Sequence, residues 1–294
     1  MSDPVGVAVV DLSRWLAVRW LADRRRPPGP VPLLEYSVLG RDRSGAGTRI
    51  ALLAGYPDLR HPDLRGARVT TRPAGRGRAS HEHTAGGTAL ASLLVGQGAA
   101  HVRGLVPEAQ LLVAPVHDVD GACADQRIVS AVRWSLDAGA QVLVLPFVRV
   151  RPARRVAVTV RAAAEGGTRV FVAAETAGSH TLTFPASVSG VAAVTGHDRA
   201  AMLPSSSHLA HLAAPGRDVP AAGPDGPVRL TGSAPAAVLA AGAWAGLLGR
   251  PDALPDASAA WAGEPGVPEV PYVPDRAQGR PRREARDRDH LVDA

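Results

Sequence analysis

The chain has 294 residues, 46% of them hydrophobic, and a formal net charge of +6. This length is enough for one large α/β domain with a buried core or for two small domains. No run of about 18 apolar residues occurs, so no membrane-spanning helix is expected. The first residues, MSDPVGVAVVDLSRW, have no basic segment ahead of a continuous apolar stretch. We therefore expect no secretory signal, and we expect the protein to be cytoplasmic.

Two residue types are missing from the chain. All 33 basic residues are arginine, because the sequence has no lysine, and it has no asparagine either. Mechanisms that use a lysine Schiff base or a lysine general base are excluded. Cys123 is the only cysteine, so an internal disulfide and a multi-cysteine metal site are excluded, and no cofactor or metal is expected. The arginines are interleaved with acids and aromatic residues are few, so a nucleic-acid partner is not expected.

The N-terminal part, residues 1–48, is predicted to be an extension with one amphipathic helix. In DLSRWLAVRWLADRRR, the apolar residues Leu12, Trp15, Leu16 and Trp20 recur at helical spacing. The following RPPGPVP ends the predicted helix, because proline cannot continue it. The simplest interpretation is a helix that packs on the main domain.

Residues 49–249 alternate short apolar runs with longer amphipathic segments. The predicted strands are RIALLA, QLLVAPV, QVLVLPF, TRVFVAA and VAAVTG, and the predicted helices are GTALASLLVG, DQRIVSAVRWSLDAG, RRVAVTVRAAAEGG and APAAVLAAGAWAGLLG. Such alternation predicts an α/β fold in which helices cover both faces of a parallel sheet, a three-layer α/β/α arrangement. Residues 250–294 are rich in proline and charge and lack apolar periodicity, so they are expected to form an extended or disordered tail.

Read in order, these segments resemble the subtilisin-like serine peptidases, the subtilases. RIALLAGYPDLRHPDL is similar to the family's strand that ends in Asp-Ser/Thr-Gly and continues to His-Pro-Asp-Leu. GGTALAS resembles its His-Gly-Thr helix, RVFVAAETAG the strand with Ala-Ala-Gly-Asn, and TGSAPAAVLAAG the Gly-Thr-Ser segment with its alanine-rich helix. About 200 residues match in the expected order. The resemblance implies a subtilisin-like fold and, for an intact member, serine endopeptidase activity.

The resemblance also assigns the catalytic positions, one residue at a time. The nucleophile position falls on Ser233, the base on Gly86, the carboxylate that orients the base on Ala54, and the side-chain oxyanion donor on Thr176. Glycine cannot accept a proton, and alanine cannot hold an imidazole. Loss of the base lowers turnover by about 10⁶, and loss of an oxyanion donor by about 10²–10³. Peptidase activity is therefore expected to be absent, with no group placed to deprotonate Ser233, which then acts as a helix cap.

The substrate-binding edge implied by the family falls on Pro146 and Phe147 in LPFVRV, where the family has Ser-Leu-Gly. Proline there removes a backbone donor that would pair with an extended peptide. His61 and Asp63 in HPDL resemble residues that fix the turn and are not expected to be catalytic. Glu175 lies next to the oxyanion position, where its carboxylate would repel an oxyanion, and its direction is left open.

A displaced base is the alternative. SHEHTAGG places His83 and Glu82 just before the predicted helix, with His81 beside them, and a related family with this fold uses a glutamate as base. Asp58 or Asp63 would then have to orient that base. The histidines alone are a weak metal signal.

Two functions follow. The first is an inactive pseudoprotease that binds a peptide or a protein partner, such as a precursor peptide or an active peptidase, in bacterial peptide maturation or secretion. The second is an active serine endopeptidase that uses Ser233 with a displaced base.

Overall fold

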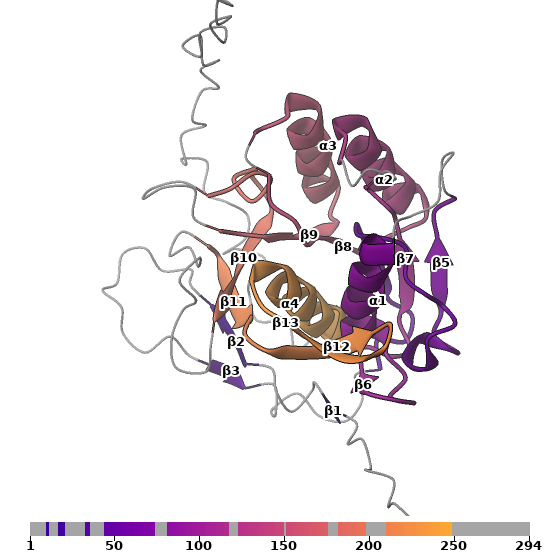
Figure 1. The fold of residues 1–294 in the computed structure, drawn as a ribbon. Coiled ribbons are helices and arrows are strands. Elements are labelled where there is room, and N and C mark those ends of the chain that lie inside the picture. The colour runs from indigo at the N-terminus through magenta and orange to yellow at the C-terminus, as the bar shows by residue number, and fades with distance from the viewer. Residues whose placement is uncertain are drawn as a thin grey trace, which may run out of the picture. The chain divides into compact units, whose positions relative to one another are not determined.

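A computed structural model describes residues 10–11, 17–20, 33–35, 44–73, 81–117, 123–149, 151–175, 182–197 and 210–248. Within these residues the main sheet has nine strands (Figure 1). In spatial order they are β3 (Leu33–Glu35), β2 (Ala17–Trp20), β11 (Leu212–Pro215), β10 (Ala192–His197), β9 (Arg169–Ala173), β8 (Val142–Leu145), β4 (Arg49–Leu52), β7 (Gln110–Val113) and β5 (Val69–Thr71). From β11 to β5 all neighbours are parallel, whereas β2 and β3 are antiparallel at one edge.

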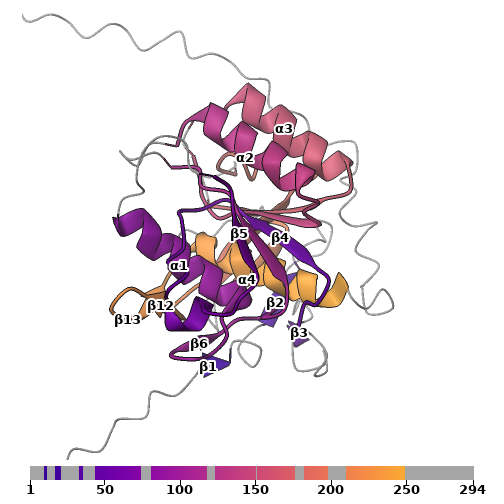
Figure 2. The same cartoon turned by 90° about the vertical axis from the view of Figure 1, so that its right-hand side faces the viewer.

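Helices cover both faces of this sheet. In Figure 1, α2 (Asp125–Asp137) and α3 (Arg154–Glu165) lie side by side above it. The helices α1 (His81–Val95) and α4 (Ser233–Leu248) lie on the opposite face, as the turned view in Figure 2 also shows. The predicted three-layer α/β/α fold with a parallel sheet is confirmed.

Each central strand contributes to two hydrophobic cores because its side chains alternate between the faces. In β4, Ile50 and Leu52 belong to the core beneath α1 and α4. The intervening Ala51, and Leu53 just after the strand, belong to the core beneath α2 and α3. Burial on both faces explains why the parallel strands are short, uninterrupted apolar runs in the sequence.

Small residues let α4 lie close to α1. Nearly every residue of α4 is buried, which its alanine-rich sequence permits. A Cβ atom added at Gly242 would lie 2.9 Å from Leu105 Cδ1 and 3.1 Å from Leu94 Cδ2. This close contact sets the spacing between the middle of α4 and the residues Leu94 and Leu105.

The helix predicted within residues 11–26 is wrong for the part of this segment that the structure describes. This segment contains β1 (Val10–Asp11) and β2, and β2 pairs antiparallel with β11 through Leu212 opposite Trp20 and Ala213 opposite Arg19. Without β2, strand β11 would leave its outer row of backbone groups unpaired. A helix of about ten residues is marginal in water, so pairing at a sheet edge outweighs the helical spacing of the apolar residues.

Several short elements complete the described part of the fold. They are β6 (Val102–Arg103), which pairs with β1, the 3₁₀ turn η3 (Pro62–Leu64), and the hairpin of β12 (Val219–Gly223) and β13 (Gly226–Leu230). The predicted tail, residues 250–294, lies outside the described residues. Among the helices described here, none has both the length and the apolar character that crossing a bilayer requires.

Candidate functional site

The candidate site lies at the edge of the sheet where the parallel strands end. Strand β4 leads directly into the turn that contains Ala54, and β9 leads into Glu175. The helices α1 and α4 begin on the same face of the sheet and carry Gly86 and Ser233. In α/β folds with parallel strands, ligands bind at this carboxyl-end edge.

Ala54 is a core residue. Its exposed fraction is 4%, and its side chain belongs to the core between the sheet and helices α1 and α4. Its carbonyl oxygen accepts a hydrogen bond from Val116 N at 3.2 Å. The methyl group therefore fills a packed position and offers no polar atom to a neighbour.

Gly86 and Gly87 differ sharply in their surroundings. Gly86 is exposed, and a Cβ atom added there would meet no other atom within 4 Å. A Cβ atom at Gly87 would collide with the carbonyl oxygens of Gly55 and Tyr56. The helix α1 thus touches the turn after β4 through Gly87, which brings the region of Gly86 against the turn that carries Ala54.

Thr88 strengthens the same contact. Its hydroxyl oxygen accepts a hydrogen bond from Asp58 N at 2.8 Å, and the hydroxyl donates to Thr84 O at 2.7 Å. The start of α1 and the turn after β4 are therefore fixed to each other by a side-chain bond as well as by close backbone contact.

Ser233 is the first residue of α4, and its exposed fraction is 3%. It follows Gly232, whose φ of +127° favours glycine and whose N–H donates to Gly216 O at 2.7 Å. The Ser233 hydroxyl donates a hydrogen bond to Glu175 Oε1 at 3.1 Å. This bond brings together the end of β9 and the start of α4, which lie 58 residues apart in the chain.

Thr183 fixes the backbone of Glu175. Glu175 N donates to Thr183 Oγ1 at 3.2 Å, and Thr183 N donates to Glu175 O at 3.1 Å. Because both its N–H and its carbonyl oxygen are hydrogen-bonded, the backbone of Glu175 has a fixed position from which the side chain extends to Ser233. Among the described residues, Ser233 is its only hydrogen-bond partner.

Three kinds of comparison bear on this geometry. No protein-family profile matches the sequence. A subtilisin-like protease of Coccidioides posadasii (strain C735) is 29% identical over 215 residues, which are 70% of this chain and 53% of that protein. The chain thus spans about half the length of this curated relative.

Two solved structures support the same relationship. A serine-to-alanine mutant of the PatA protease domain is 27% identical with a TM-score of 0.65, covering 71% of this chain and 82% of that one. The prenylagaramide maturation protease PagA is 25% identical with a TM-score of 0.60, covering 72% and 76% of the two chains. The chain is a relative of the subtilisin-like proteases. The PatG macrocyclase, solved in complex with a peptide, shares the fold at 19% identity and a TM-score of 0.60.

The structure answers the question left open for Glu175. Its carboxylate points to Ser233, so the expectation that no basic group lies within reach of this hydroxyl is wrong. The sequence shows that an acid lies beside the position assigned to the oxyanion donor, but not where that acid points. Thr176 itself lies outside the described residues, so its assignment stays a prediction.

The two residues considered as a displaced base, Glu82 and His83, lie on a helix. The helix α1 begins at His81, so Glu82 and His83 are part of it, and the expectation that they precede it is wrong. Serine is favoured immediately before a helix, and Ser80 precedes this one in the sequence. The side chains of Glu82 and His83 lie outside the described residues.

Asp58 and Asp63 are both engaged elsewhere. The Asp58 carboxylate accepts hydrogen bonds from Arg60 N and Arg60 Nε, and the backbone bond is the main cause that lowers the pKa of Asp58. Asp63 is fully buried and accepts bonds from Ala100 N, His101 N and Val102 N at 2.7–3.1 Å. Neither carboxylate is free to orient a base.

Asp63 and His61 instead fix the turn, as expected. The Asp63 backbone N–H donates to His61 Nδ1 at 3.1 Å at the start of η3. In the same region the Tyr56 hydroxyl donates to Arg72 O at 3.1 Å, and burial raises the pKa of Tyr56.

The predicted substrate edge follows β8. Pro146 is buried and Phe147 is half-buried against the core beneath α2 and α3. Two residues later, Arg149 N donates to Phe184 O at 2.7 Å, and the Arg149 guanidinium pairs with Asp125. At Arg149 the chain therefore pairs with its own backbone; the peptide-binding role of Pro146 and Phe147 stays a prediction.

Within the described ranges, no three His, Cys, Asp or Glu side chains gather as a metal site would require.

Proposed function

We propose that this chain is a catalytically inactive homologue of the subtilisin-like proteases that binds a peptide, such as the precursor in a peptide-maturation system. The observation that carries the proposal is the pair of positions Ala54 and Gly86. The first is a packed methyl group, and the second is a glycine beside open space. Neither can supply the proton acceptor or its orienting carboxylate that acyl transfer by a serine requires.

The bond between Ser233 and Glu175 does not replace these groups. A carboxylate at 3.1 Å can in principle accept the proton of the hydroxyl. It lies, however, beside the position where the resemblance puts the oxyanion donor. A negative charge there opposes the oxyanion that forms when a serine attacks a peptide bond. The carboxylate is better suited to hold the hydroxyl in place.

Peptide binding is supported by the relatives. PatA and PagA are named maturation proteases, and PatG was solved with a peptide. Each name describes that protein, and the proposal extends peptide binding, without cleavage, to this chain. An active peptidase is the second partner that the proposal allows.

The same hydrogen bond supports a second candidate, an active serine endopeptidase. In that case Glu175 would be the base for Ser233, in place of the displaced His83 or Glu82. Its carboxylate is the one group within the described residues that lies at bonding distance from the hydroxyl.

A fluorophosphonate probe separates the two candidates, because it reacts only with an activated serine. The full chain is incubated with the probe, and the adduct is located by mass spectrometry. We expect no adduct on Ser233 in the wild-type chain. We expect an adduct in a restored variant that carries Ala54→Asp, Gly86→His and Thr176→Asn, and none when Ser233→Ala is added to it.

Two results would contradict the proposal. One is an adduct on Ser233 in the wild-type chain that disappears in Glu175→Gln, which would establish the second candidate. The other is a correctly folded restored variant without any adduct, which would show that the assigned positions are wrong.

A further inference from the structure

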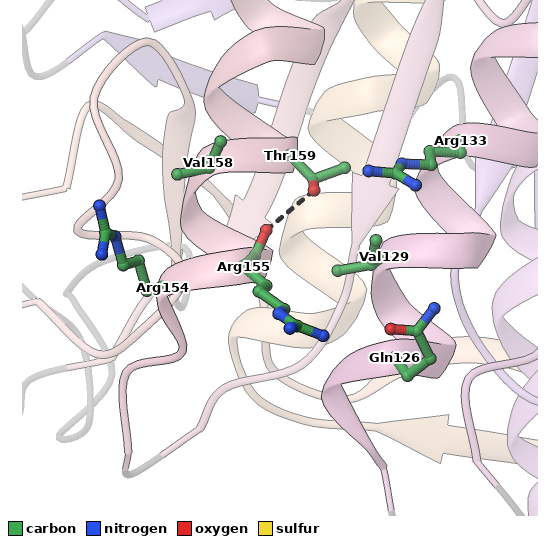
Figure 3. Close-up of a pocket in the computed structure, with 7 residues that line it drawn as sticks. All are labelled: Gln126, Val129, Arg133, Arg154, Arg155, Val158 and Thr159. Atoms are coloured by element: carbon green, nitrogen blue, oxygen red, sulfur yellow. Dashed lines mark hydrogen bonds between the residues drawn. The ribbon is translucent and has the colours of Figure 1, made fainter.

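The helices α2 and α3 enclose an open groove on the outer surface of their layer (Figure 3). Its volume is about 540 Å³, within the range of ligand sites in proteins. We call it the arginine groove, and it is lined by Gln126, Val129, Arg133, Arg154, Arg155, Val158 and Thr159. It is separate from Ser233 and Glu175, which lie at the end of β9 and the start of α4.

The arginines of the groove have no counter-charge. Within the described residues, the guanidinium groups of Arg133, Arg154 and Arg155 make no ion pair or hydrogen bond, and all three residues are exposed. In Figure 3, Arg155 extends from α3 toward α2, and Arg133 extends from α2 toward Thr159 on α3. Guanidinium groups from both helices therefore reach into one concave surface.

The placement of Arg154 and Arg155 is unfavourable for the helix itself. They are the first two residues of α3, whose first turn has no acidic residue and whose N-cap, Ala153, makes no side-chain cap bond. Positive charges at a helix N-terminus oppose the helix dipole. An anion bound beside them would reduce both their unfavourable interaction with the helix dipole and the repulsion between the two arginines.

The groove also has an apolar part. Val158 has an exposed fraction of 58%, the largest among the bulky hydrophobic side chains that the structure describes. In Figure 3, Val158 lies on the same side of α3 as Arg154, and Thr159 and Arg155 lie nearer to the buried Val129 of α2. An aliphatic side chain of a ligand would cover Val158 while neighbouring carboxylates pair with the arginines.

We propose that the arginine groove binds an acidic segment of the peptide partner. Arginine pairs with carboxylates in a bidentate geometry, and the exposed valine requires an apolar residue between the acids. Nucleic acid fits less well, since no aromatic side chain lines the groove on which a base could stack. The inference rests on the proposed function only in taking the ligand to be a peptide.

The position of the groove suits a peptide that continues beyond the substrate edge. The helix α3 begins five residues after Arg149, on the segment that leaves β8 past Pro146 and Phe147. The helix α2 begins at Asp125, which pairs with Arg149. The two helix starts thus lie at the same carboxyl-end edge of the sheet as the predicted peptide site.

The test uses the full chain and a fluorescein-labelled dodecapeptide in which glutamate alternates with leucine and serine. The matched peptide has glutamine in place of every glutamate, and binding is followed by fluorescence anisotropy. We expect the glutamate peptide to bind about tenfold more tightly or better. The variant Arg133→Gln, Arg154→Gln, Arg155→Gln should remove this difference.

A matched control loses the same charge elsewhere. Arg65, Arg68 and Arg103 are exposed and lie outside the groove, so replacing all three by glutamine should leave the preference unchanged. Equal losses in the two triple variants would overturn the proposal, because the attraction would then be general. Tighter, groove-dependent binding of a single-stranded DNA of equal charge would overturn it as well.

Charge reversal gives an independent check that does not depend on a loss of binding. A variant with Arg133→Glu and Arg155→Glu should prefer the peptide in which arginine replaces glutamate, and circular dichroism should show that it is folded. No gain for the reversed peptide would contradict the proposal. Probe labelling of Ser233 would overturn the proposed function and leave the groove result unaffected, so the two failures can be told apart.

Discussion

If Glu175 opposes acyl transfer, its removal should increase activity in a chain that has a base. The perturbation is Glu175→Gln in the restored variant, which carries Ala54→Asp, Gly86→His and Thr176→Asn. Glutamine keeps the size of the side chain and can accept the bond from Ser233, whose hydroxyl lies 3.1 Å from Glu175 Oε1. Only the negative charge is lost.

The magnitude follows from this distance. The oxyanion forms on the carbon that Ser233 Oγ attacks, so it lies about 5 Å from the carboxylate, where two unit charges repel by about 3 kcal/mol at an effective dielectric constant of 20. Removal of that repulsion corresponds to an increase in rate of about 10². The assay is the labelling rate with a fluorophosphonate and the hydrolysis of a fluorogenic peptide.

A matched control separates this local effect from a change in net charge. Glu165 is an exposed acid at the end of α3, and Glu165→Gln in the restored variant should leave the rate unchanged. A rate that falls with Glu175→Gln would refute the reasoning, because Glu175 would then be assisting Ser233 as a base.

Three further predictions concern stability, measured as urea unfolding followed by circular dichroism. Gly87→Ala should destabilise the fold by about 1–3 kcal/mol through overpacking, whereas Gly86→Ala, in open space on a helix, should stabilise it by about 0.5–1 kcal/mol; equal effects would contradict the close contact at position 87. Asp63→Ala should cost about 3–5 kcal/mol, because three N–H groups lose the buried carboxylate that accepts their hydrogen bonds, while Asp58→Ala should cost at most about 1 kcal/mol; a small effect of Asp63→Ala would show that the N–H groups find other partners. Burial raises the pKa of Tyr56, so this side chain ionises at a lower pH in the unfolded chain than in the folded one, and the free energy of unfolding falls as the pH rises above about 10. Tyr56→Phe should reduce this dependence on pH. An unchanged dependence would contradict the attribution of the effect to Tyr56.

The elements that the sequence predicts well are those with a local cause. The apolar residues of α2, such as Ile128, Val129 and Val132, recur on one face and are buried as the helical period requires. The strand β4 is a continuous apolar run because both of its faces are covered. Segment 11–20 also has helical spacing, but the unpaired edge of β11 decides its structure, and that edge is formed by residues about 200 positions away.

The site shows the same division. Gly87 and Gly232 are required by the backbone, and the motifs that contain them indicate this. Gly87 is needed for the close contact with Gly55, and Gly232 for its positive φ. The direction of the Glu175 side chain has no local cause. It depends on Ser233, 58 residues away, and on the two bonds with Thr183, so neither the composition nor the spacing of AAETAG predicts it.

The surroundings of Ala54 and Gly86 make a coupled prediction that tests their assignment. A carboxylate at position 54 would enter a site whose exposed fraction is 4%, where an unpaired charge costs several kcal/mol. Ala54→Asp alone should therefore destabilise the fold, by about 2–4 kcal/mol. A histidine at position 86 would extend into open space on the adjoining turn of α1, so Gly86→His alone should have little effect.

If the two positions face each other as the family's aspartate and histidine do, the imidazolium will pair with the buried carboxylate. The double variant should then recover about 1–3 kcal/mol relative to the sum of the single changes, which is the range measured for residues in contact. The recovery should become smaller above the pKa of the introduced histidine in the folded double variant, where the imidazole is neutral and only its N–H bond to the carboxylate remains. Additive effects at every pH would show that the two side chains do not meet, and the assignment of Ala54 and Gly86 would fail even if the fold is intact.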